Sequence, residues 1–181
     1  MTYDQIFQRN QFLSMFPLGS DNYSFSSNAA TAIILLQVEF NKRVQEYEAD
    51  MQEALKKLKK EGFDDRAKAI AEMEAIDNMV KAYQADPTKP QPTHEDIAKA
   101  EEIRKTESDY RNEYEELEKK WIEVRSRKGA EEVPNFNPKL DKKDYEDIVK
   151  AIGVVGDMEL PNVKEPIPKT AFLLTVAEFF T

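Results

Sequence analysis

Chemistry in this chain would most readily come from its single histidine or from paired carboxylates. His94 stands at the start of an expected helix, just after a proline-rich stretch. Catalytic dyads and imidazole metal sites need further partners. No Glu-x-x-His spacing, the motif of carboxylate-bridged metal sites in helical bundles, is present to supply one. We therefore interpret His94 as a surface residue at a helix start.

Carboxylates are plentiful, but their pattern is that of a solvated helix face. Acid–base catalysis by paired carboxylates needs two such groups with different environments in one cleft. Here they alternate with Lys and Arg, which favours i,i+4 ion pairs on a wet surface. The five glycines are scattered and form no phosphate-binding loop. We expect no catalytic residue, no cofactor and no metal. A hydrolase or metal site assembled only by folding remains the alternative. The carboxylates considered are Glu101, Glu102, Glu113, Glu115, Glu116 and Glu118.

Basic residues gather at the ends of two expected long helices. Helix C-termini attract cations, and this is the favoured interpretation. If the two helices run parallel, however, both clusters converge at one tip and could bind an anionic surface of a protein partner. The residues concerned are Lys56, Lys57, Lys59, Lys60, Lys119, Lys120, Arg125, Arg127 and Lys128.

An aromatic stripe follows the second long helix, with Tyr110, Tyr114, Leu117 and Trp121 at helical spacing. Tyr and Trp are enriched in interface hot spots, but such a stripe is more often core between neighbouring helices. We assign these four residues to packing, either within one chain or between copies of it.

The elements that position these residues are read from apolar periodicity. A long helix over 28–61 carries Ile33, Leu36, Phe40 and Val44 on one face and ends before Gly62, a left-handed stop. Its first turns, AATAIILL, are apolar all round and are predicted to be fully buried. A helix over 64–84 should fold back against it, because the turn is short.

Three prolines in residues 86–92 forbid helix, and Thr93 with Asp96 then opens a second long helix over 94–128. Residues 1–27 form a short helix, capped by Thr2 with Gln5, and a loop. Residues 129–181 form a C-terminal annex, which we expect to pack on the apolar beginning of the first long helix. It has a short helix after Asp141, extended segments read as a small hairpin or an edge strand, and a last helical turn over 176–180. The fold class is mainly α: a long antiparallel hairpin or three-helix, coiled-coil-like bundle over 28–128 with this annex.

Composition narrows the class of protein. The chain has 181 residues, 34% of them charged, a net charge of −9 and no cysteine. The acidic balance argues against broad nucleic-acid binding, and the start of the chain lacks the features of a signal peptide. No apolar stretch approaches the ~20 residues of a membrane helix. We expect a cytoplasmic or virion-associated protein that binds no nucleic acid and no membrane.

The segments SNAATAIILLQVEFNKRVQEYEADMQEALKKL and IPKTAFLLTVAEFF resemble small helical accessory proteins of tailed bacteriophages. The resemblance covers roughly residues 26–85 and 165–181, and it implies a structural or assembly role without carrying over any functional residue. We expect a non-enzymatic protein–protein interaction or assembly component that forms homo-oligomers or joins a larger assembly. The alternative is a small acidic inhibitor of a host enzyme or nucleic-acid-binding protein.

Overall fold

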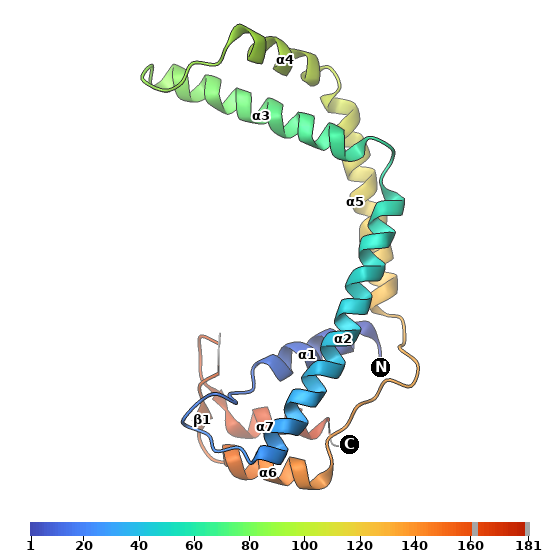
Figure 1. Cartoon of the computed structure of the whole chain (residues 1–181), viewed down its shortest axis with the longest axis vertical. Coiled ribbons are helices and arrows are strands. Elements are labelled where there is room, and N and C mark those ends of the chain that lie inside the picture. Colours follow the sequence, from blue (N-terminus) through green and yellow to red (C-terminus); the bar gives the residue numbers. More distant parts are fainter. Residues whose placement is uncertain (161–162, 180–181) are drawn as a thin grey trace. The chain divides into compact units, whose positions relative to one another are not determined.

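The computed structural model describes residues 1–160 and 163–179 (Figure 1). The chain is mainly helical, as predicted, with one small antiparallel sheet. No described helix is long and apolar enough to cross a membrane. The elements are α1 (Tyr3–Ser14), α2 (Ser27–Leu58), α3 (Phe63–Ala85), α4 (His94–Arg104), α5 (Glu107–Gly129), α6 (Lys142–Ile152), β1 (Asp157–Met158), β2 (Ile167–Pro168) and α7 (Lys169–Ala177).

The chain divides into two compact units. Unit 1 comprises Met1–Asp50 and Arg127–Thr181, and unit 2 comprises Met51–Ser126. Helices α2 and α5 each contribute residues to both units.

The core of unit 1 is built from aromatic and aliphatic side chains of α1, α2, α6 and α7. Phe40 of α2 is fully buried, with its ring centroid 5.1 Å from that of Phe136 and 5.9 Å from that of Phe179. At the first turn of α2, the Ser26 hydroxyl donates to a carboxylate oxygen of Asp147 in α6 at 3.0 Å. The C-terminal segment therefore packs on the first half of α2, as the sequence predicts.

The predicted helix caps are present. The Thr2 hydroxyl accepts a hydrogen bond from the backbone N–H of Gln5, and the Gln5 side-chain oxygen accepts one from the backbone N–H of Thr2. Thr93 and Asp96 form the same reciprocal arrangement before α4. Gly62 lies between α2 and α3 with φ of +72°, the left-handed conformation expected of it. Local side-chain chemistry thus sets the ends of these helices.

The C-terminal segment is more helical than its sequence suggests. β1 and β2 pair as the predicted small hairpin, with Asp157 opposite Pro168 and Met158 opposite Ile167. The residues after this hairpin form α7, of which Phe172, Leu173 and Val176 are buried. Only a last turn over 176–180 is predicted there. Residues 161–162 of the predicted extended segment, and Phe180, lie outside the described residues.

The predicted helix over 94–128 is wrong at one point, because it is two helices. α4 ends at Arg104 and α5 begins at Glu107. The Thr106 backbone N–H and hydroxyl both donate to the Ile103 carbonyl oxygen at 2.9 Å, which replaces the regular helical bond. Threonine hydroxyls compete for backbone groups in this way, and no proline or glycine marks the position.

The helix that folds back on α3 is α4, and not α2 as predicted. In unit 2 the buried residues Ile70, Met73 and Ile76 of α3 pack against Ala100 of α4. The two helices run in opposite directions, joined by the proline-containing segment (Figure 1). The predicted antiparallel hairpin therefore exists, but it forms one helix later in the chain.

The first turns of α2 are buried on one side only, which corrects the prediction of full burial. Ile33, Leu36 and Phe40 are buried, whereas Ile34, Leu35 and Val38 are 48%, 58% and 59% exposed. Successive helical residues differ by about 100° around the axis, so these two sets lie on opposite faces. Unit 1 supplies neighbours for the first face alone.

Candidate functional site

The residues first considered for chemistry lie on α4 and α5, and His94 is not among the residues that line a groove with the carboxylates of α5. His94 is the first residue of α4 and is exposed. Residues 1–160 and 163–179 hold no cluster of three or more His, Asp or Glu side chains that could bind a metal ion. Two of the carboxylates considered above, both on α5, form ion pairs: Glu113 with Arg66 of α3, and Glu116 with Lys60 just after α2.

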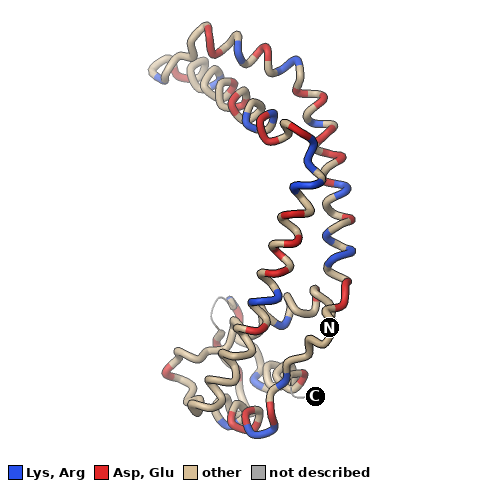
Figure 2. Tube along the Cα trace, turned by 45° about the vertical axis from the view of Figure 1, so that its right-hand side comes forward, with Lys and Arg blue, Asp and Glu red and all other residues tan. Residues whose placement is uncertain are grey.

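Helices α2 and α5 do not run parallel as considered above, although Lys59 and Lys60 of the first basic cluster and Lys120 of the second line one crevice in unit 2. In unit 2, Lys60 just after α2 lies 3.7 Å from Glu116, near the middle of α5. In unit 1, Lys128 at the end of α5 lies 3.0 Å from Asp50 of α2. The basic end of each long helix is thus placed beside the interior of the other, so α2 and α5 run antiparallel. Lys and Arg alternate with Asp and Glu along both helices (Figure 2).

The nine basic residues have unequal surroundings. Lys57 pairs with Glu53, Lys59 with Asp64, and Lys128 with both Asp50 and Glu131. Lys60 pairs with Glu116, as described above. The remaining residues, Lys56, Lys119, Lys120, Arg125 and Arg127, are exposed. A role of these cations in partner binding stays a prediction.

The predicted aromatic stripe lies in unit 2, where α3 meets α5. Tyr110 is half-buried, 5.4 Å from the ring of Phe63 and packed on the α3–α4 core. Tyr114 is 49% exposed, and its ring centroid is 6.3 Å from that of Tyr110. Leu117 lines a crevice with Leu58 and Phe63. Trp121 is half-buried further along α5.

Tyr110 and Tyr114 form one side of a groove of about 490 Å³ between α3 and α5, which we call the α3–α5 groove. Its other side is α3, where the small side chains of Ala67 and Ala71 flank Ile70. Burial raises the pKa of the Tyr110 hydroxyl above its ordinary value. The remaining lining residues are charged: Glu74, Arg111, Glu115 and Glu118.

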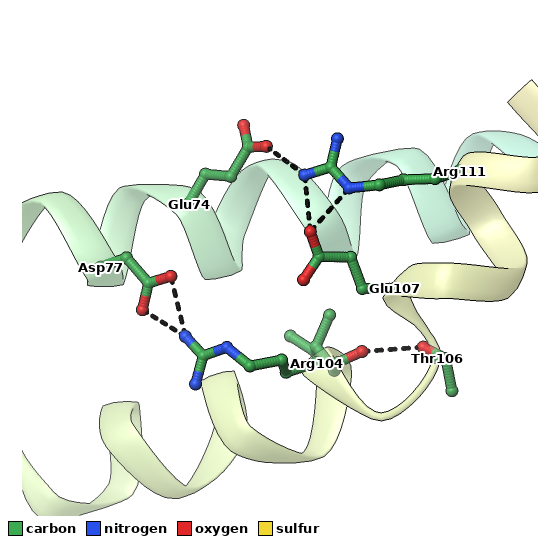
Figure 3. Close-up of polar contacts among 7 residues, drawn as sticks. Glu74, Asp77, Arg104, Thr106, Glu107 and Arg111 are labelled. Carbon is green, nitrogen blue, oxygen red and sulfur yellow. Dashed lines mark hydrogen bonds and ion pairs between the residues drawn. The ribbon is translucent and has the colours of Figure 1, made fainter. Parts of the chain in front are cut away.

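A set of ion pairs fixes the start of α5 against the α3–α4 hairpin (Figure 3). Arg111 lies 2.7 Å from Glu107 through Nε and 3.5 Å from Glu74 on α3 through Nη2. Arg104, at the end of α4, donates to both carboxylate oxygens of Asp77 at 2.6 and 2.8 Å. These contacts hold the helix break, and with it one end of the α3–α5 groove, in a defined geometry.

The second candidate is the exposed side of α2 in unit 1, formed by Ile34, Leu35 and Val38, which we call the α2 aliphatic face. A helix that is apolar on every side is normally buried on every side. The apolar run AATAIILL is predicted to be buried on every side, but Ile34 and Leu35 within it are exposed, as is Val38 beyond it. The apolar run spans more of the helix circumference than one neighbouring layer can cover. This width was the sequence feature that could have indicated an exposed face.

The chain was compared with protein-family models, with curated proteins and with solved structures, and none of them matches it. The function must therefore be argued from the two surfaces.

Proposed function

We propose that this protein is a non-enzymatic helical assembly component that self-associates through the α2 aliphatic face. The observation that carries the proposal is the exposure of Ile34, Leu35 and Val38 opposite a complete core. Contiguous exposed aliphatic groups on a surface mark interaction sites, whereas singly scattered ones do not. Residues 34, 35 and 38 are neighbours at helical spacing and so form a continuous patch.

The occupant we propose is a second copy of the chain. With a net charge of −9, two copies repel each other unless they meet where charge is balanced. The exposed residues around the face include the uncharged Thr31, Asn41 and Gln45, and one charge of each sign, Glu39 and Lys42. A two-fold axis would bring identical patches together, so aliphatic side chains would cover each other without net repulsion.

The test is the mass of the protein in solution, measured by light scattering over a range of concentrations. The full chain should form dimers whose fraction rises with concentration. Leu35→Ser combined with Val38→Ser should shift the protein to monomer, because the substitutions remove apolar surface from the interface. These exposed positions contribute little to the core, so the circular dichroism spectrum should not change.

The matched control is Val154→Ser with Val155→Ser, which removes two exposed aliphatic side chains elsewhere in unit 1. This variant should dimerise like the unaltered chain. A strict monomer at high concentration, or equal loss of dimer in both double variants, would overturn self-association through the α2 aliphatic face. The alternative function, inhibition of a host protein, remains a prediction from sequence.

A further inference from the structure

We propose that the α3–α5 groove of unit 2 binds a cationic amphipathic helix of a different protein. An apolar side chain of that helix would lie between Ala71 and Tyr114, and its Lys or Arg residues would face Glu115 and Glu118. This interaction is separate from self-association, because it uses other residues in the other unit.

Small side chains leave the groove open. Ala67 and Ala71 lie one turn apart on α3, and Tyr110 and Tyr114 lie one turn apart on α5. Each alanine ends at Cβ, so the space between the helices is not filled, while Ile70 provides an apolar floor that is 6% exposed. A volume of about 490 Å³ is enough for large side chains of a partner.

The charge at the rim selects a cation. Arg111 is the basic residue of the lining, and it is already engaged by Glu107 and Glu74. Glu115 and Glu118 form no ion pair with any residue in the described part of the chain. The faces of tyrosine rings also attract Lys and Arg. The groove therefore combines an apolar floor with an uncompensated negative rim.

The dimensions favour a helical segment as the occupant. The lining residues of α5 run from 110 to 118, which is about 12 Å of helix at ~1.5 Å per residue. Two turns of an amphipathic helix present side chains at i, i+3 and i+4 over the same length, the common way in which a helix occupies a groove. Lys or Arg residues next to the apolar side chains of the partner helix would then reach the carboxylates of Glu115 and Glu118.

The probe is a fluorescent, amidated helical peptide of about 14 residues built from Leu and Lys, titrated into the full chain and followed by anisotropy. A peptide in which Glu replaces every Lys tests charge, and one in which Ser replaces every Leu tests the apolar anchor. The Leu–Lys peptide should bind at least about tenfold more tightly than either of these, because only it satisfies both the floor and the rim.

Two variants test the groove by different physical effects. Glu115→Gln with Glu118→Gln removes the rim charge, and Ala71→Leu fills the space. Each should weaken binding of the Leu–Lys peptide about tenfold, the effect expected when a contact at the centre of an interface is lost. All three positions are exposed, so the variants should fold, which circular dichroism verifies.

The control is Glu101→Gln with Glu102→Gln, which makes the same change in net charge on exposed residues of α4 in the same unit. This control should change the affinity for the peptide less than about twofold, because the two charges on α4 do not line the groove. Equal weakening in both pairs, or unaltered binding to Ala71→Leu, would show general attraction to an acidic protein and overturn the proposal. The Leu35→Ser, Val38→Ser variant should bind the peptide normally, so the two proposals can fail independently.

Discussion

Among the ion pairs described in unit 2, the pair formed by Arg66 and Glu113 is the most enclosed. Arg66 Nη2 lies 2.9 and 2.8 Å from the two carboxylate oxygens, and Nη1 donates to the backbone carbonyl of Glu61 at 3.0 Å. The Glu113 side chain is 12% exposed. One guanidinium thus joins the turn between α2 and α3 to α5, close to the α3–α5 groove.

Replacing Glu113 with alanine should lower the free energy of unfolding by about 2 kcal/mol, because Arg66 would lose a charged, largely enclosed hydrogen-bond partner. Glu116→Ala is the matched control on the same helix. Its ion pair with Lys60 spans 3.7 Å between side chains that are more than 60% exposed, so it should cost less than about 0.5 kcal/mol. Urea unfolding monitored by circular dichroism measures both. Equal losses would contradict the prediction.

Gly62→Ala should destabilise the protein by about 1 kcal/mol, since φ of +72° places a Cβ too close to the following carbonyl. The added Cβ would also lie 3.0 Å from Arg66 Nη1 and disturb the pair with Glu113. Gly19→Ala is the control, because nothing lies within 4 Å of its Cβ position. That variant should be neutral when the unfolding of both variants by urea is followed by circular dichroism. A neutral Gly62→Ala would show that the turn can relax.

Features that depend on neighbours in sequence were predictable. The pairs Thr2–Gln5 and Thr93–Asp96 each act over three residues, and Gly62 acts at one, so the ends of α1, α4 and α2 follow from local chemistry. The break at Thr106 was missed because a threonine in a charged helical run carries no strong signal, unlike proline or glycine.

Features that depend on distant residues were not predictable. The α3–α5 groove needs Ala71 and Tyr114 on opposite walls, and a stripe of periodic residues does not specify its partner helix. The same ambiguity led to the prediction that α3 packs on α2. Ile34 and Leu35 lie within the apolar run that the sequence predicts to be core, and only the number of layers around α2 leaves them exposed. Periodicity identifies faces, but it does not identify what covers them.

The capping bonds at the start of α4 should make its stability sensitive to acid. Hydrogen bonds from the Thr93 hydroxyl, then from its backbone N–H, lower the pKa of Asp96 below the ordinary value of 3.8. A lowered pKa in the folded state means that Asp96 stabilises the fold above pH 3.8, and this contribution is lost as the pH falls through the folded-state value. Thr93→Ala should move the carboxyl titration of Asp96, followed by carbon NMR, back toward 3.8. An unchanged titration would contradict the assigned cause.

The close approach of Gly129 to Asp4 permits a double-variant test of unit 1. Gly129 ends α5 and is buried, and a Cβ placed there would overlap the carboxylate of Asp4 in the first turn of α1. Gly129→Ala should therefore cost about 0.5 kcal/mol of unfolding free energy, because the exposed Asp4 side chain must leave its rotamer to make room for the added Cβ. In an Asp4→Ala background the obstacle is gone, and the same substitution should stabilise the helix by about 0.5 kcal/mol because alanine is the better helix former.

The sign of the Gly129→Ala effect should thus reverse between the two backgrounds, which urea unfolding of the four proteins in the cycle can measure. Asp4→Ala alone supplies the reference for the lost acidic group at the start of α1. A penalty of the same size in both backgrounds would place the obstacle at another group, and no penalty in either would show that Asp4 turns aside without cost.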